Sequence, residues 1–290
     1  MCRLFGLTTG GPRVETAFWL LDAPDSLVSQ SRRMPDGAGL GWFSLGDEPV
    51  RDRAPVAAHD SDDFDILARN VVSHTFIAHV RYSSGTALDV HNTHPFDMKD
   101  RLFAHNGVVR ESKRLSEWLS DIDKALIEGV TDSELVFAYI TAEIARLGDT
   151  TEGLISAVGR IAAELPVYSL NLLLAEPRRI WALRYPATHE LWVLNPEVGG
   201  FAGTRELTPR REPGRLEIGG DDRTVPAYVV ASERMDDDPD WRLLAPGELL
   251  VIEGLKARSM FPFPEPARPL TIEDLSGHEL KSQAPMTPGR

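Results

Sequence analysis

The chain has 290 residues, of which 42% are hydrophobic, so it can bury a sizeable core as one large domain or two smaller ones. Its 44 acidic and 31 basic side chains give a net charge of −13, and no block of Lys and Arg could follow a phosphate backbone, which argues against nucleic acid as a partner. No apolar run approaches the roughly 18 residues that a membrane span needs, and the first residues lack the pattern of a secretion signal. We therefore expect a soluble cytoplasmic protein without a membrane partner.

Strand patterns dominate the first part of the chain, and helical patterns follow. Apolar residues recur with period two, or in short runs bounded by turn residues, over Arg3–Thr8, Leu40–Ser44, His74–Tyr82 and Leu102–His105. Apolar residues three and four apart predict helices over Glu111–Ile122, Asp132–Leu147 and Thr151–Leu165. A second set of strands is predicted over Tyr168–Ala175, Arg179–Tyr185, Glu190–Leu194, Ala227–Ser232 and Leu249–Glu253.

This order favours one fold class. Strands, then helices, then strands again, with too few helices for a βαβ alternation, predict a layered α+β domain. We place that single domain at residues 2–259, with a long loop over Thr204–Thr224. Met260–Arg290 carries repeated prolines and little periodicity, so we expect a partly disordered C-terminal tail.

The only cysteine of the chain, Cys2, follows the initiator methionine. One thiol excludes an internal disulfide and a zinc site built from several thiolates. A lone cysteine is more often a small buried hydrophobe than a nucleophile. Here, however, removal of Met1 would leave a thiol and a free α-amine on one residue, and an amine with a pKa of about 7.7–8.0 can act as the base that activates the thiol.

Arg81 and Ser84 stand where a predicted strand ends, in His79-Val80-Arg81-Tyr82-Ser83-Ser84. The end of a strand is where the chain often continues into a loop that binds a ligand. Arg81 could simply face solvent, but arginine pairs with a carboxylate through two parallel donors, so Arg81 is a candidate clamp for a substrate carboxylate.

Asn106-Gly107 has two readings. Asn-Gly is first of all a hairpin turn signal. The same pair could instead point a side-chain amide and a backbone N–H at one spot, which is what a developing oxyanion needs.

Asp132 lies in Thr131-Asp132-Ser133-Glu134, which reads as a helix start. An acid in the first turn often does no more than complement the helix dipole. An exposed carboxylate there could also receive the ammonium of an amino-acid substrate, at the opposite end from Arg81.

Histidines crowd the same part of the chain, so a metal site has to be weighed. His91-Asn92-Thr93-His94 lacks the helical HExxH context, and no pattern of carboxylates accompanies it. We favour loop and supporting roles for these histidines, and expect neither a metal nor a cofactor.

Taken in order, several short motifs resemble those of class II glutamine amidotransferase domains. The motifs are Met1-Cys2, Met34-Pro35-Asp36-Gly37, His79-Val80-Arg81-Tyr82-Ser83-Ser84, Thr93-His94-Pro95-Phe96, His105-Asn106-Gly107 and Thr131-Asp132-Ser133-Glu134. Each is weak alone, but their common order is a specific signal. The resemblance implies a four-layer αββα N-terminal-nucleophile (Ntn) hydrolase fold.

By matching position, the resemblance implies roles for individual residues. Cys2 would be the nucleophile, and Asn106 with Gly107 the oxyanion hole. Arg81 would bind the α-carboxylate of a glutamyl group and Asp132 its α-ammonium. Ser84 and Gly37 would line the same pocket.

The sequence also departs from the commoner family pattern. Arg3 replaces the usual glycine, Ser84 stands where threonine is frequent, and no synthase domain follows the glutaminase-like part. The Met-Cys-Arg opening is similar to stand-alone members, including the γ-glutamyl hydrolase of ergothioneine biosynthesis. Three interpretations stay open: an amidase that cleaves glutamine or a γ-glutamyl conjugate, a glutaminase subunit that supplies ammonia to a synthase protein, and a non-catalytic amino-acid-binding module. Assembly with a second copy of the chain is open as well.

Overall fold

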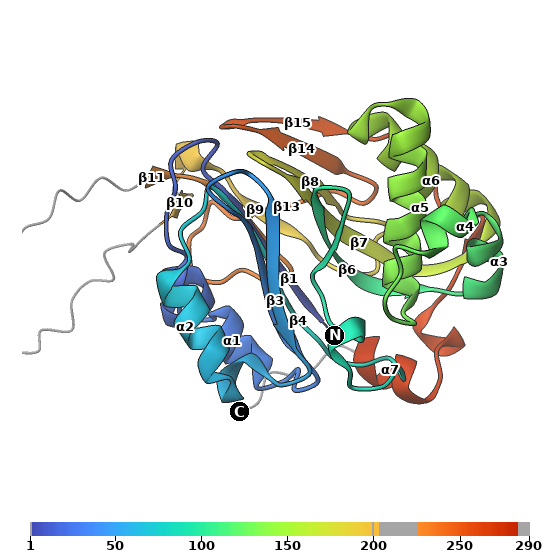
Figure 1. Cartoon of the computed structure of the whole chain (residues 1–290), viewed down its shortest axis with the longest axis horizontal. Helices are drawn as coiled ribbons and strands as arrows, with labels where there is room; N and C mark the ends of the chain where they lie inside the picture. The colour runs from blue at the N-terminus through green and yellow to red at the C-terminus, as the bar shows by residue number, and fades with distance from the viewer. Residues whose placement is uncertain (1, 199, 203–224, 284–290) are drawn as a thin grey trace, which may run out of the picture.

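Two large sheets lie face to face in the computed structural model, which describes residues 2–198, 200–202 and 225–283 (Figure 1). The first sheet has the strand order β13-β9-β12-β1-β4-β2-β3. Its members are β1 (Arg3–Thr8), β2 (Ala38–Phe43), β3 (Pro49–Ala54), β4 (Thr75–Val80), β9 (Trp192–Leu194), β12 (Tyr228–Ala231) and β13 (Arg242–Leu243).

The second sheet has the order β15-β14-β8-β7-β6-β5, and β16 pairs with β7. Its members are β5 (Phe96–Met98), β6 (Arg101–Val109), β7 (Pro166–Glu176), β8 (Arg179–Leu183), β14 (Leu249–Glu253), β15 (Lys256–Met260) and β16 (Arg268–Pro269). Two further strands, β10 (Phe201–Ala202) and β11 (Val225–Pro226), form a separate pair.

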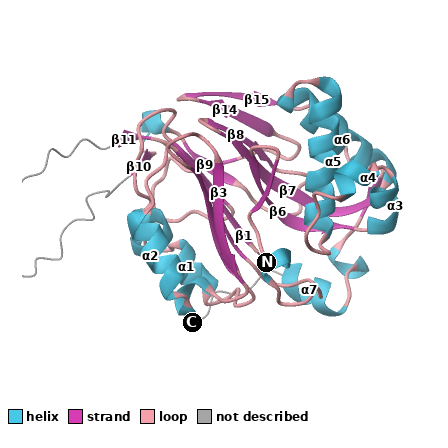
Figure 2. Ribbon diagram, in the orientation of Figure 1, coloured by secondary structure: helices cyan, strands magenta, loops and turns pink. Residues whose placement is uncertain are grey.

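Helices cover the outer faces of both sheets, as the cyan ribbons of Figure 2 show. The α-helices are α1 (Leu27–Ser31), α2 (Asp62–Asn70), α3 (Ser112–Glu117), α4 (Asp121–Lys124), α5 (Asp132–Leu147), α6 (Thr150–Glu164) and α7 (Gly277–Gln283). Short 3-10 or π turns occur at Phe18–Asp22, Ala58–Asp60, Val90–Asn92, Pro196–Val198 and Ile272–Asp274. None of the helices described is long and apolar enough to cross a membrane.

Three apolar interfaces separate the layers. One cluster joins α5 and α6 to the second sheet, where the rings of Phe103 and Phe137 stack with centroids 4.7 Å apart. Another joins α1 and α2 to the first sheet through residues such as Leu27 and Phe64. A third lies between the two sheets. The fold is therefore a four-layer αββα arrangement, which confirms the predicted α+β class.

Strand β1 shows how the sequence places the start of the chain inside this stack. Successive side chains of a strand point to opposite faces. Leu4 accordingly joins the core between the sheets, while Phe5 and Leu7 join the core beneath α1 and α2. Every residue of β1 is buried, so Cys2, directly before it, is held by a strand fixed on both faces.

Most predicted elements are confirmed, with three kinds of difference. The helix expected over Glu111–Ile122 is two helices, α3 and α4, because the Ser120 side chain accepts a hydrogen bond from the Asp123 N–H and starts a new helix there. Strands β3 and β15 and helix α2 were not predicted. Both strands lie at sheet edges and are rich in charged residues, so they lack the alternation of apolar and polar residues that predicts a strand.

The stretch expected to be a tail contains ordered elements. Beyond Met260, β16 pairs with β7, and Leu275 packs against Val108 and Tyr168. Helix α7 follows and ends at Gln283. The predicted loop at Thr204–Thr224 and the last residues, 284–290, lie outside the described part of the chain.

Candidate active site

The site forms where β1 begins and β4 ends. These strands are antiparallel, and Arg3 lies opposite Val80, so the residue before β1 meets the residues after β4. The backbone N–H of Tyr82 donates to the Cys2 Sγ at 3.2 Å, and the thiol lies 3.3 Å from the Tyr82 carbonyl oxygen. The sheet register alone therefore brings Cys2 next to Arg81 and Tyr82.

Cys2 is 9% exposed, and its surroundings act on its ionisation in opposite directions. Burial raises the pKa of the thiol above its ordinary value, against the Tyr82 backbone hydrogen bond and the positive charges of Arg81 and Arg3, which lower it. Because the net effect is a raised pKa, the thiol is protonated near neutral pH. A nucleophile in this state needs a base to remove its proton.

A cavity of about 30 Å³ opens at the thiol. It contains five of the predicted site residues, namely Cys2, Arg81, Ser84, Gly107 and Asp132. The remaining lining comes from Tyr82, Thr86, His94, His105, Thr131, Ser133 and Gln283. Segments from both sheets, α5 and α7 thus meet at one cavity.

Arg81 is buried, with only 4% of its surface exposed. Its guanidinium donates to the Thr86 Oγ1 at 2.5 Å and to the Ser83 Oγ at 3.4 Å. Burial lowers the pKa of this group, and the Cys2 and Asp36 charges oppose that effect. In the part of the chain that the structure describes, no carboxylate forms an ion pair with Arg81, so its charge is available to an incoming anion.

Asn106-Gly107 lies inside β6, paired with Asn171 and Leu170 of β7, so the hairpin-turn reading is wrong. A Cβ at Gly107 would lie 1.9 Å from the Ser169 carbonyl oxygen, and so only glycine fits at this point of the cavity wall. The Asn106 side chain donates its amide N–H to the Cys2 carbonyl oxygen at 3.0 Å. Asn106 does not itself line the cavity but contacts the residue that carries the thiol.

Asp132 is the first residue of α5, as its sequence context predicts, and the Thr131 side chain caps the helix. Its Oδ2 accepts from the Val109 N–H at 2.8 Å, which ties the start of α5 to the end of β6. The following Ser133 lies 2.9 Å from the His105 Nδ1. The carboxylate is therefore fixed on the side of the cavity formed by β6 and α5.

Gly37 is not among the cavity-lining residues. Its carbonyl oxygen accepts from the Arg81 N–H at 2.8 Å, so it supports the backbone of Arg81 from behind. The structure thus places Gly37 behind Arg81 and not in the cavity wall, where it was predicted.

Two histidines, His79 and the cavity-lining His94, pack together. The rings of His79 and His94 lie 4.3 Å apart, and burial lowers the pKa of His79 to about 3 and that of His94 well below its ordinary value. Both rings are therefore neutral. Within the described residues there is no group of three or more His, Cys, Asp or Glu side chains that could hold a metal ion.

Comparison with known proteins identifies the family. The model of the class II glutamine amidotransferases matches residues 1–273. The chain belongs to this family.

Relatives of this class II glutamine amidotransferase are distant in sequence. The chain is 30% identical over 168 residues to the probable glutamine amidotransferase DUG3 of Saccharomyces cerevisiae. The match covers 51% of this chain and 47% of that protein, so the chain spans about half of that relative's length. It is 25% identical over 222 residues to the putative glutamine amidotransferase YafJ of Escherichia coli, over 72% of the chain and 79% of the relative.

Solved structures share the fold. A class II domain protein from Silicibacter pomeroyi superposes with a TM-score of 0.61 at 20% identity, over 90% of this chain and all of that one. The phosphoribosylpyrophosphate amidotransferase of Bacillus subtilis superposes with a TM-score of 0.60 at 19% identity, over 90% of this chain and 49% of that one. These likenesses confirm the Ntn-type fold.

Sequence reasoning did not find the pair that anchors the start of the chain in this amidotransferase. The Arg3 guanidinium, 3% exposed, donates to the Cys2 carbonyl oxygen at 3.2 Å and forms an ion pair with Glu233. Glu233 also pairs with Arg33 at 3.2 Å. No local pattern links residues so far apart in the chain.

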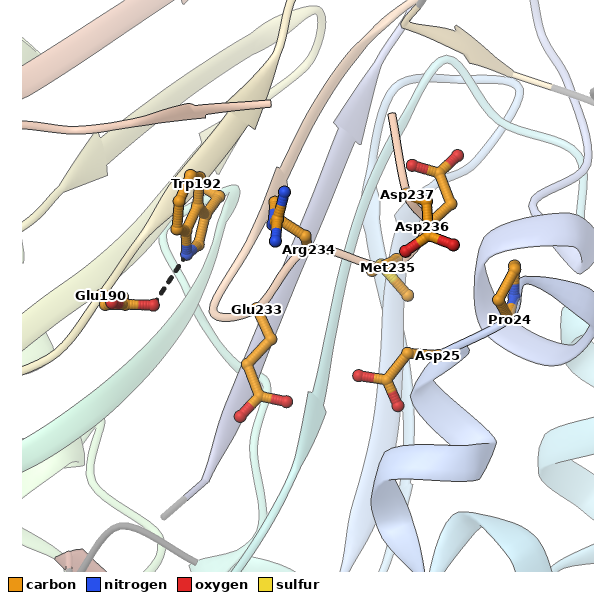
Figure 3. A pocket seen from close by; sticks show the side chains of 9 residues that line it. All are labelled: Pro24, Asp25, Glu190, Trp192, Glu233, Arg234, Met235, Asp236 and Asp237. Atoms are coloured by element: carbon orange, nitrogen blue, oxygen red, sulfur yellow. Dashed lines mark hydrogen bonds between the residues drawn. The ribbon is translucent and has the colours of Figure 1, made fainter. Parts of the chain in front are cut away.

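Glu233 faces a second, larger cavity of about 490 Å³ (Figure 3). Its lining includes acidic side chains around Trp192 and Arg234 and none of the predicted site residues. Figure 3 shows Glu233 and Asp25 on one side of this space and Asp236 and Asp237 on another. Its described lining includes no thiol, so this cavity is not the candidate site of Cys2.

Proposed function

We propose that this chain hydrolyses the γ-amide bond of glutamine or of a γ-glutamyl conjugate, with Cys2 as the nucleophile and glutamate as one product. The observation that carries the proposal is the cavity in which Cys2, Arg81, Gly107 and Asp132 converge. Family membership supports the reaction class. The retained thiol argues against a module that only binds an amino acid.

Recognition of the glutamyl group would use both of its charges. Arg81, a buried cation without a carboxylate partner among the described residues, would bind the α-carboxylate. Asp132 would bind the α-ammonium, because a carboxylate oxygen can accept more than the one backbone N–H that each already holds. Ser84 would contact the same group, and Gly37 would act through the Arg81 backbone.

The chemical step is an acyl transfer through a thioester. The Cys2 sulfur forms a bond to the carbonyl carbon of the γ-amide, and the oxyanion that results is stabilised by the Gly107 N–H and an Asn106 amide N–H. The C–N bond breaks, the thiol proton passes to the leaving nitrogen, and a γ-glutamyl thioester remains. Water then adds to the thioester, the C–S bond breaks, and glutamate and the thiol are released.

The base in this scheme is the α-amine that Cys2 would carry once Met1 is removed. The raised pKa of the thiol makes such a base necessary at neutral pH. The amine lies on the same residue as the thiol, and β1 and the Arg3 contact hold that residue in place.

A second candidate is that the chain supplies ammonia to a separate synthase. The relevant observation is that it corresponds to 49% of the B. subtilis phosphoribosylpyrophosphate amidotransferase. In this version the partner would be a protein that supplies the acceptor site. Co-elution with a synthase on native purification supports it, and efficient turnover by the isolated chain argues against it.

One experiment tests the main proposal and separates its two branches. The processed chain is incubated with glutamine and with γ-glutamyl amides that carry different groups on the nitrogen, and glutamate release is measured. Glutamate release that depends on Cys2 supports the proposal. The preferred amide then shows whether the substrate is glutamine or a γ-glutamyl conjugate. If no amide yields glutamate, with or without candidate synthases, the proposal is wrong.

A further inference from the structure

Helix α7 reaches the cavity of Cys2 from the other end of the chain. Gln283, its last residue, lines that cavity and is 2% exposed, and the adjacent Ser282 is fully buried. In Figure 1 the helix lies beside the mark of the N-terminus, in agreement with the shared cavity. Gln283 lies beyond residue 273, where the match to the family ends. The wall it forms thus lies outside the residues that the family model matches.

A buried histidine fixes the Gln283 side chain. Burial lowers the pKa of His189 to about 4, against the opposing effect of its hydrogen bond to the Gln283 oxygen, so the ring is neutral. The His189 Nε2 lies 2.7 Å from the Gln283 Oε1. A neutral imidazole can donate from this nitrogen, which holds the amide in one orientation against the cavity.

Side chains hold the rest of α7 in place. Arg110 pairs with Glu279 at 2.6 Å and donates to the Asp274 carbonyl oxygen at 2.8 Å. By contrast, Cys2 directly precedes β1, which pairs with β4 along its length, and Gly107 lies in β6, which pairs with β7 up to a register shift at Val108 and Val109. The α7 wall is the one whose position depends on a few side-chain contacts.

The cavity is small, so the position of the α7 wall affects which groups can fit beside Cys2. About 30 Å³ is room for two or three water molecules, since each needs about 10–15 Å³ of such volume. A glutamyl group is larger than this, so the side chains that line the cavity, Gln283 among them, limit what can bind there.

We propose that Gln283 is a specificity-determining residue that limits the size of the group admitted beside Cys2. Applied to substrates, this rests on the proposed function and favours γ-glutamyl amides with a small group on the nitrogen. The steric claim stands independently of turnover, because it concerns access to the thiol.

Alkylation of the only cysteine in the chain tests the steric claim directly. The rates of Cys2 modification by iodoacetamide and by a bulky N-aryl maleimide are compared in the wild type and in Gln283→Ala. Removing the side chain should raise the maleimide-to-iodoacetamide rate ratio by about 10-fold or more, the usual effect of steric exclusion by a group of this size. An unchanged ratio would overturn the proposal.

Two control variants separate size from other effects. Gln283→Glu keeps the size of the side chain and an oxygen that accepts from His189, so its rate ratio should stay within about two-fold of the wild type. Leu280→Ala, at a 39% exposed position of α7, should likewise leave the ratio unchanged. If all three variants raise the ratio alike, α7 has merely loosened and Gln283 has no specific role.

Substrate selectivity then separates this inference from the proposed function. For Gln283→Ala, kcat/KM for a γ-glutamyl anilide should rise at least about 10-fold relative to that for glutamine. If the wild type turns over and this ratio does not move, the inference fails alone. If no amide is cleaved while the alkylation ratio rises as expected, the proposed function fails and the steric role of Gln283 stands.

Discussion

The two ends of the described chain meet at one cavity but are held there in different ways. At the N-terminal end, Cys2 precedes a strand buried between two layers and paired on both edges. At the C-terminal end, α7 is docked through the Arg110–Glu279 and His189–Gln283 contacts. On the proposed function this difference separates two tasks: the groups proposed to react are held by a paired strand, while the wall proposed to select the ligand is held by side-chain contacts.

Replacing the proposed nucleophile should have the largest effect, and it tests whether the N-terminal end carries the reacting group. Cys2→Ala should remove all measurable glutamate release, because no second thiol exists in the chain. The folded state should persist, since alanine fills most of the same buried space. Turnover assays with a thermal melt as the control check this, and retained amidase activity would show that the rigid end is not the reacting one.

The oxyanion donor comes next in expected effect. Asn106→Ala should lower kcat by about 100–1,000-fold with a smaller change in KM, because the interaction strengthens in the transition state. Asn106→Asp keeps the shape of the side chain while removing its N–H donors, and should behave alike. A loss of less than about 10-fold in both variants would assign Asn106 to holding the Cys2 carbonyl only.

The substrate clamp should respond in KM. Arg81→Lys keeps the charge but loses the paired donors, so KM should rise by about 10–100-fold while kcat changes little. The alkylation rate of Cys2 by iodoacetamide serves as the control for an intact thiol. A change confined to kcat would contradict a role in binding the α-carboxylate.

Arg3 offers a test through pH. Its positive charge lowers the pKa of the Cys2 thiol in part, against the larger effect of burial. Removing that charge in Arg3→Met should therefore move the alkylation profile of Cys2 to higher pH. Arg3→Met with Glu233→Gln also removes the carboxylate that had paired with Arg3, and should show a smaller shift. A shift to lower pH would refute this assignment.

The smallest effect is expected at the C-terminal end. Glu279→Gln removes a partly exposed ion pair, which is worth about 0–1 kcal/mol, so the global Tm should fall by less than about 4 °C. Limited proteolysis should nevertheless cut near α7 faster than in the wild type. A larger loss of Tm would mean that α7 belongs to the cooperative core, and the contrast between the two ends would disappear.

The sequence predicts the reacting end far better than the docked end. Arg3–Thr8 is a strand as predicted because its apolar residues fill two cores, and the α5 start at Thr131-Asp132 is marked by its cap. Gln283 carries no such mark. Its part in the cavity depends on His189, a contact between residues far apart in the chain that no local period records.

The oxyanion candidate shows a second limit of the sequence. Asn106-Gly107 has the composition of a turn, yet it continues β6, because the neighbouring strand β7 supplies partners on one side and the glycine lets the two backbones approach. Tertiary pairing here overrides local turn preference. The charged edge strand β3 was missed for the related reason that its partner, and not its own pattern, makes it a strand.

The central claim is that Cys2, freed of Met1, is the nucleophile of a glutamyl-binding cavity. The most direct test is to treat the chain with a diazoketone analogue of glutamine and map the adduct by mass spectrometry, with an excess of glutamate present in a parallel sample. The account predicts one adduct on an N-terminal peptide that begins with Cys2, and protection by glutamate. An adduct elsewhere, or active protein that still carries Met1, would contradict it.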